Sequence, residues 1–184
     1  LFVEQSPVSE ATRGVLTVLQ ALGVDPKQET LAAAREAVAA YSPHAYVDLI
    51  LTKANVSSVV MTNDPFDSLE RPVWEEGPEV DPRFHAALRI DTLLLKWTEV
   101  RPQLNAWGYE ASDALDPTSL QEVRRFLTDW IDRMDPVYLA ASLPVDFTMP
   151  AQTAAARLLE QAVFPISQER GVPFAFMPGV RRSV

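Results

Sequence analysis

Apolar positions along the chain recur with two spacings that alternate. Short, almost wholly apolar runs at residues 56–61, 85–90, 137–143 and 174–177 predict β-strands, and continuous apolar character predicts burial on both faces. Between these runs, apolar residues recur every three or four positions, which predicts amphipathic helices. Strands that alternate with such helices predict an α/β fold with a parallel sheet covered on both faces.

Helix start and stop residues predict the ends of the first helices. Ser9 is a capping residue at the start of an apolar-periodic stretch that Gly23 ends. Asp25, followed by Pro26, predicts the start of a helix that continues through the Ala-rich run at residues 31–40. A further helix is predicted over residues 43–54, and residues 1–3 could close a preceding strand.

The same signals divide the second part of the chain. Prolines and an acidic patch predict an exposed loop over residues 72–82, and Asp91 is placed to cap a helix over residues 92–100. Residues 108–116 read as a connector, and Asp116 opens the next helix. A last helix is predicted over residues 151–171, kinked or split by its Pro165. The apolar stripe of the helix after Asp116 comprises Leu120, Val123, Phe126, Leu127, Trp130 and Ile131.

Four β/α units amount to about half of an eight-stranded β/α barrel. The chain begins with Leu1 rather than Met, and it stops just after a predicted strand and its turn. We therefore expect one partial barrel domain over residues 1–184 that belongs to a longer chain. No internal repeat at a fixed period indicates a solenoid.

Composition narrows the classes of partner. The chain has 184 residues, 47% of them hydrophobic, and a formal net charge of −9. This charge argues against a nucleic acid or an anionic membrane as partner, since both need clustered Lys and Arg. The lack of Cys excludes disulfides and thiolate sites. No apolar run approaches the roughly 20 residues of a membrane span, so we expect a cytoplasmic protein. The expected partner is a small molecule, and a homo-oligomer remains open.

Polar residues follow the strand predicted at residues 56–61, at the end where α/β folds bind ligands. Thr62, Asn63 and Asp64 are therefore candidates to face the barrel mouth and orient a polyhydroxylated substrate. The alternative is that the carboxylates of Asp64 and Asp67 bond backbone N–H groups and hold a turn. Both interpretations stay open at this point.

Two histidines, His44 and His85, are the only ones in the chain. His44 stands at a predicted helix start and His85 at the entrance of a predicted strand, so a surface or structural role is expected for both. There is neither a His-x-His pair nor a Gly-rich phosphate loop. A metal site built from this chain alone is therefore not expected.

Residues 61–69 read Met-Thr-Asn-Asp-Pro-Phe-Asp-Ser-Leu. This stretch resembles the Thr-Thr-Asp-Asp-Pro-x-Asp-Ser-Leu signature of the uronate isomerase family, a branch of the amidohydrolase superfamily, with Asn63 where the family usually has its first Asp. The resemblance implies a (β/α)8 TIM barrel that interconverts D-glucuronate and D-fructuronate, or D-galacturonate and D-tagaturonate. It further implies proton transfer between C2 and C1 through an enediol, in carbohydrate metabolism.

Arg89 is the candidate to bind the substrate carboxylate. Leu88-Arg89-Ile90-Asp91 resembles the family's Pro-x-x-Arg-Pro-Asp strand, whose Arg has that role, and the guanidinium fork suits a carboxylate. The alternative is a structural ion pair of Arg89 with Asp91 or Asp64.

Two further positions follow from the resemblance. Arg181 keeps the Arg of a family strand written Gln-x-His-Ile-Gly-Ala-x-Arg-Asn, in which Phe176 or Met177 stands here in place of the His. Ser142 keeps the Ser of a family Ser-Asp-His, whose Asp and His are replaced. The general base, and a divalent metal such as Zn²⁺ in the full-length protein, would come from segments outside this chain.

Three other functions stay open. A divergent amidohydrolase-type barrel would hydrolyse an ester or amide, but it needs an activated water. A carbohydrate-binding barrel could have lost the chemistry, as the missing His residues would permit. The chain could also be a complete α/β domain whose acidic surface binds a basic partner.

Overall fold

The computed structural model of the chain describes residues 9–25 and 32–179. The contacts divide the chain into two compact units, residues 1–57 and residues 58–184. The prediction of a single partial barrel domain over residues 1–184 stays a prediction.

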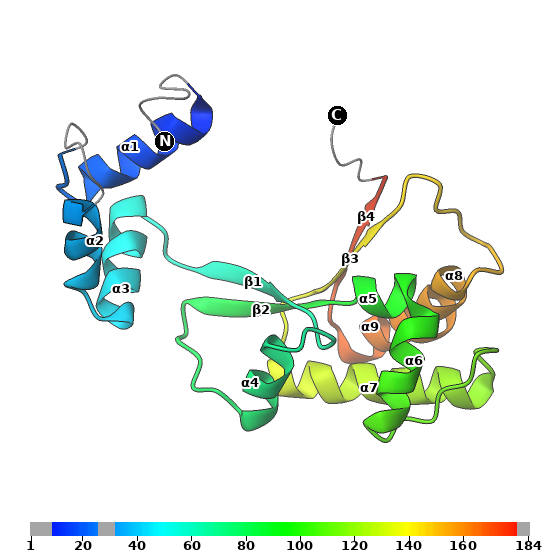
Figure 1. Cartoon of the computed structure of the whole chain (residues 1–184). Helices are drawn as coiled ribbons and strands as arrows, with labels where there is room; N and C mark the ends of the chain where they lie inside the picture. The colour runs from blue at the N-terminus through cyan, green and yellow to red at the C-terminus, as the bar shows by residue number, and fades with distance from the viewer. Residues whose placement is uncertain (1–8, 26–31, 180–184) are drawn as a thin grey trace. The chain divides into compact units, whose positions relative to one another are not determined.

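The described part of the first unit consists of α1 (Glu10–Ala21), α2 (Ala32–Ala39) and α3 (Pro43–Ala54) (Figure 1). Ser9 caps α1 as predicted, since its side-chain oxygen accepts the backbone N–H of Thr12. The end of α1 before Gly23 and the range 43–54 are also confirmed. The predicted strand at residues 1–3 and the Pro26 helix start lie outside the described residues.

Described residues of the second unit form one four-stranded sheet (Figure 1). Its strands are β1 (Val59–Asn63), β2 (Phe84–Arg89), β3 (Leu139–Leu143) and β4 (Phe174–Pro178). They lie in the order β1-β2-β3-β4, and every neighbouring pair is parallel. The predicted parallel α/β architecture is confirmed.

The first strand begins later than predicted. Asn55 adopts a left-handed conformation that ends α3, and pairing with β2 starts only at Val59, whose N–H donates to the carbonyl of Arg83. Pairing with β2 continues to Asn63, which lies opposite Leu88. Thr62 and Asn63 are therefore strand residues rather than loop residues.

Burial of the strands separates the middle of the sheet from its edges. β2 and β3 are largely buried, with Leu88 and Leu139 fully enclosed. In β1 and β4 most side chains are partly or fully exposed, including Val60 and Phe176. The prediction of strands buried on both faces is therefore right for the central pair and wrong for the two edge strands, each of which has a neighbouring strand on one side only among the described residues.

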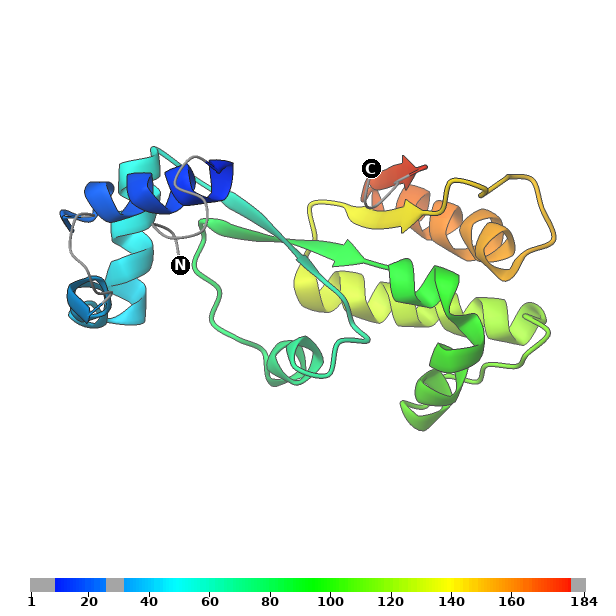
Figure 2. The same cartoon turned by 45° about the horizontal axis from the view of Figure 1, so that its top comes forward.

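The core lies between the sheet and the long α7 (Pro117–Met134), which runs alongside β2 (Figure 2). Asp116 caps α7 through the N–H of Ser119, as the sequence predicts. All six residues of the predicted apolar stripe are buried, and Trp97 is buried as well. The capping residue and the apolar period both predict the same helix, so α7 is the best predicted element.

Three predicted segments differ from or refine the expectation. The loop predicted over residues 72–82 is wrong at residues 72–76, which belong to α4 (Glu70–Glu76). Pro72 lies in the first turn of this helix, where its missing N–H costs nothing. The helix predicted over residues 92–100 is interrupted at Lys96, giving α5 (Asp91–Leu95) and α6 (Trp97–Ala106). The last helix is not interrupted at Pro165; instead its form changes, because a π-helical turn ends two residues before this proline. The helix consists of α8 (Ala154–Leu158), the π-helical turn (Leu159–Val163) and α9 (Phe164–Arg170).

Within the described ranges, no helix is long and apolar enough to cross a membrane.

Candidate functional site

The carboxyl ends of β1, β2 and β3 open into one pocket of about 610 Å³. Volumes of this size are ordinary for small-molecule sites, and the carboxyl edge of a parallel sheet is where such sites occur. Most of the pocket's lining residues are polar or charged. They include Thr62, Asp64, Arg89, Asp91, Thr92 and Ser142. Four predicted site residues are thus brought together, three of them from separate strands and Asp64 from the turn after β1.

Arg89 and Asp91 form a two-point ion pair at the end of β2. Arg89 Nε donates to Asp91 Oδ2 at 2.8 Å, and Arg89 Nη2 donates to Asp91 Oδ1 at 2.6 Å. The hydrogen bonds with Asp91 raise the pKa of Arg89 above its ordinary value. Burial acts to raise the pKa of Asp91, but the hydrogen bonds from Arg89 and Ser142 outweigh it, so this pKa is lowered. Both groups are charged at neutral pH.

This pairing corrects the predicted role of Asp91. The residue was expected to cap a helix, but it is the first residue of α5, and that helix has no side-chain cap hydrogen bond. Its carboxylate instead accepts from Arg89 and from the backbone N–H of Ser142 at 2.8 Å. The Arg89 guanidinium and the N–H of Ser142 thus bind this carboxylate in place of the backbone N–H groups in the first turn of α5.

The structural ion pair that was the alternative for Arg89 is therefore formed, with Asp91 as partner. It does not use the whole guanidinium. Within the described residues Nη1 makes no hydrogen bond, and the Ser142 hydroxyl lies 3.5 Å from Nη2, at the long limit for such a bond. Arg89 lines the pocket, so its remaining N–H groups stay available to a ligand. Carboxylate binding stays a prediction.

Asp64 holds a turn and also lines the pocket. Its Oδ1 accepts the backbone N–H of Phe66 at 2.9 Å, and its Oδ2 accepts the hydroxyl of Thr92 at 2.5 Å. Burial raises the pKa of Asp64, and the nearby carboxylates of Asp91 and Glu70 act in the same direction. The proposed turn-holding role is confirmed, and the Thr92 contact additionally ties the β1 turn to α5.

Asp67 and Glu70 fix the remainder of this turn. Asp67 Oδ1 accepts the backbone N–H groups of Leu69 and Glu70, which lowers the pKa of Asp67. Glu70 Oε2 accepts the N–H of Asp64 at 2.9 Å and the Asn63 side-chain amide at 3.3 Å. Asn63 therefore contacts Glu70 and is not among the pocket-lining residues, and its predicted substrate contact stays a prediction.

Comparison with solved structures decides the family. The whole chain, 100% of its length, matches the crystal structure of a uronate isomerase (BH0493) from Bacillus halodurans C-125 at 50% identity and a TM-score of 0.93. This chain belongs to the uronate isomerase family. It spans 44% of the length of that protein's chain, and the parallel α/β unit matches part of its TIM-barrel-like fold. The predicted fold class is confirmed.

A second solved structure is less similar to this chain. A glucuronate isomerase from Caulobacter crescentus matches 82% of this chain and 36% of its own chain, with 15% identity and a TM-score of 0.48. Neither a scan against protein-family models nor a search of curated proteins found a match.

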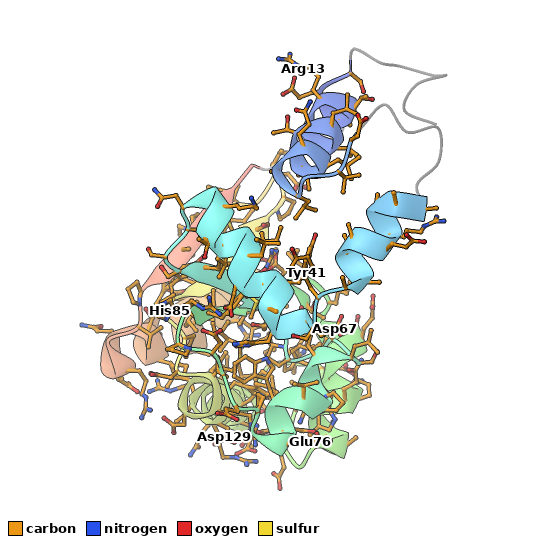
Figure 3. The ribbon with its side chains drawn as sticks, turned by 90° about the vertical axis from the view of Figure 1, so that its left-hand side faces the viewer. Arg13, Tyr41, Asp67, Glu76, His85 and Asp129 are labelled. Carbon is orange, nitrogen blue, oxygen red and sulfur yellow. The ribbon has the colours of Figure 1, made fainter. Side chains whose placement is uncertain are left out.

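Other positions named in the sequence analysis are not among the described residues that line the pocket. Arg181 lies outside the described residues, so its predicted role stays a prediction. Phe176 and Met177 are exposed residues of β4 and do not line the pocket. His85, which is labelled in Figure 3, is an exposed residue of β2. It lies near the start of this strand, whereas Arg89 lies at its end. His44 is exposed beside Asp48, which fits the surface role expected for it.

Metal binding is not supported by the residues that the structure describes. Among residues 9–25 and 32–179, no group of three or more His, Cys, Asp or Glu side chains could hold a metal ion. The divalent metal, such as Zn²⁺, that the uronate isomerase resemblance implies for the full-length protein stays a prediction.

Sequence reasoning missed two contributors to the site, Thr92 and Glu70. For Glu70 a signal existed, because Asp67 and Glu70 have the Asp-x-x-Glu spacing that is typical of a helix start. For Thr92 there was none, since its partner Asp64 is 28 residues away and meets it only across β1 and β2.

The pairing of Asn63 with Glu70 gives a testable prediction, because the uronate isomerase signature usually has Asp here. We expect Asn63→Asp to place two carboxylates in contact and to lower the free energy of unfolding by about 1–2 kcal/mol at pH 7. One of the two carboxyls would hold its proton more tightly when folded than when unfolded. The loss is therefore full at neutral pH and shrinks as the pH falls towards about 4, the ordinary carboxyl range.

Urea denaturation of the full-length protein between pH 4 and pH 7 measures this effect. Asn63→Asp combined with Glu70→Gln is the control, and it should recover most of the loss, because the amide again faces a carboxylate. An equal loss at every pH would contradict the account.

Proposed function

We propose that the full-length protein is an aldose–ketose isomerase that acts on a hexuronate. The observation that carries this proposal is the 50% identity with a uronate isomerase over the whole of the present chain. The pocket at the carboxyl edge of the sheet supports it, because its central Arg89 keeps N–H groups free for a carboxylate. The expected reactions are D-glucuronate to D-fructuronate or D-galacturonate to D-tagaturonate.

Isomerisation of this kind moves a proton between C2 and C1 through an enediol. In the proposal, this chain binds and orients the sugar acid. The Nη1/Nη2 edge of the Arg89 guanidinium, which Asp91 does not occupy, binds the C6 carboxylate. The side chains of Thr62, Asp64 and Ser142 bind hydroxyl groups of the sugar. The general base, and any divalent metal such as Zn²⁺, would come from other segments of the full-length protein.

Charge around the pocket constrains how the carboxylate is held. Arg89 shares the pocket lining with the carboxylates of Asp64, Asp67, Glu70 and Asp91. Net charge in this part of the pocket therefore does not attract an anion, and binding relies on directed hydrogen bonds from Arg89. We propose that Arg181, which lies outside the described residues, supplies a second cation.

Product analysis by NMR tests the proposed reaction. The full-length protein is incubated with D-glucuronate and with D-galacturonate, before and after treatment with a chelator. We expect at least one ketose to form, and the chelator-treated sample reports whether a metal is needed. A matched neutral aldohexose serves as the control and should react far more slowly. A folded protein that binds a hexuronate but converts neither one would favour the carbohydrate-binding alternative.

A further inference from the structure

Asp91 contacts both the guanidinium of Arg89 and the backbone of the neighbouring strand. Its Oδ2 accepts from Arg89 Nε at 2.8 Å. Its Oδ1 accepts from Arg89 Nη2 at 2.6 Å and from the N–H of Ser142 at 2.8 Å. The side chain of Asp91 is 19% exposed and that of Arg89 is 30% exposed. One carboxylate therefore links the end of β2 to β3.

The Ser142 contact continues the sheet after its backbone ladder has ended. At the end of β2, the N–H of Ile90 donates to the carbonyl of Ala140 in β3, at 2.9 Å. Because donors and acceptors of alternate residues face the same neighbouring strand, the N–H of Ser142 also faces β2. α5 begins at Asp91, and the Asp91 carboxylate takes the place of the next backbone acceptor. Its position is thereby fixed relative to β3.

A guanidinium can meet a carboxylate along two edges, and Asp91 occupies only one of them. The occupied edge is formed by Nε and Nη2. The other edge is formed by Nη1 and Nη2. In the described part of the chain it meets only the hydroxyl of Ser142, 3.5 Å from Nη2. Since a carboxylate binds such an edge through two parallel hydrogen bonds, the direction of this edge decides where a ligand carboxylate can lie.

We propose that Asp91 is the positioning residue for Arg89: it holds the Nε/Nη2 edge so that the Nη1/Nη2 edge is directed to the carboxylate of the sugar acid. This inference rests on the proposed function and deepens it. Asp91 acts through Arg89 and does not itself touch the substrate. It also balances the charge of Arg89, so its contribution is direction rather than attraction of the anion.

Steady-state kinetics of Asp91→Asn in the full-length protein test the proposal. We expect kcat to fall about 10- to 100-fold, because a small misplacement of a bound substrate has effects of this size. KM should change less than about 3-fold, since loss of the negative charge favours an anion while loss of direction opposes it. Asp132→Asn is the matched control, because Asp132 also pairs with an Arg, and it should leave kcat and KM unchanged.

A double-mutant cycle separates positioning from a structural role. If Asp91 acts through Arg89, adding Asp91→Asn to Arg89→Ala changes kcat less than about 3-fold further. An equal fall of kcat in both backgrounds, or a wild-type kcat in Asp91→Asn, would overturn the proposal. Should Asp91→Asn not fold, Asp91→Glu replaces it, and the displaced carboxylate should still lower kcat.

Failure of the proposed function remains distinguishable from failure of this inference. If the wild-type protein converts no hexuronate, the proposed function fails, and a crystal structure of full-length Asp91→Asn then decides the positioning role. The proposal expects the Arg89 guanidinium to leave the orientation described here. An unchanged guanidinium would refute the role of Asp91 whatever the substrate.

Discussion

Arg89→Ala is expected to lower kcat/KM for a hexuronate by about 100-fold or more in the full-length protein. Each charge-assisted hydrogen bond contributes about 1.5–3 kcal/mol, and the free edge of Arg89 can offer two of them to the carboxylate. The substitution also leaves the Asp91 carboxylate with only the N–H of Ser142 as a partner among the described residues. Initial rates over a range of hexuronate concentrations measure the change.

Two variants make the Arg89 result specific. Arg89→Lys keeps the charge but not the fork, so it should recover only part of kcat/KM. Arg124→Ala removes an arginine that forms an ion pair with Glu169 outside the pocket, and it should behave as wild type. A kcat/KM for Arg89→Ala within about 3-fold of wild type would contradict the carboxylate role.

Phe126→Ala is expected to cause the largest loss of stability, about 3–5 kcal/mol in the free energy of unfolding. Phe126 is fully buried at the centre of an aromatic cluster. The centroid of its ring lies 5.3 Å from the ring centroid of Tyr109, 5.4 Å from that of Phe66 and 6.3 Å from that of Trp130. No neighbouring ring can fill the space that the substitution opens without losing contacts of its own.

The same substitution should reach the pocket. Phe66 belongs to the turn after β1, and its ring packs on Phe126 and on Trp107. The backbone N–H of Phe66 donates to Asp64, so the core supports the turn that places Asp64 at the pocket. Urea denaturation of the full-length protein measures the loss. Phe126→Leu is the control and should cost less than half as much, whereas equal midpoints for Phe126→Ala and wild type would contradict this packing.

Local signals predicted the elements that depend on local interactions. Asp116 followed by Pro117 and an apolar period predicted α7, whose stripe is buried as expected. The loop prediction is wrong around Pro72, because proline is compatible with the first turn of a helix as well as with a loop. Exposure of Val60 in β1 depends on which strands lie beside it, and the apolar run alone does not carry that information.

The candidate site was predicted in its members but not in its connections. Thr62 and Asp64 lie at the carboxyl end of an apolar run, and this position together with the family resemblance predicted that they line a ligand site. The contacts that organise it are long-range in sequence. Asp91 meets Ser142 across 51 residues, and Thr92 meets Asp64 across 28, distances over which helix and strand periods carry no signal.

A crystal structure of the full-length protein with a bound hexuronate tests most directly whether this pocket receives the sugar acid. The account predicts that the C6 carboxylate lies on the Nη1/Nη2 edge of Arg89, with oxygen–nitrogen distances of about 2.7–2.9 Å, while Asp91 keeps the Nε/Nη2 edge. A hexuronate bound with its carboxylate away from Arg89, or outside the pocket between the ends of β1, β2 and β3, would contradict it.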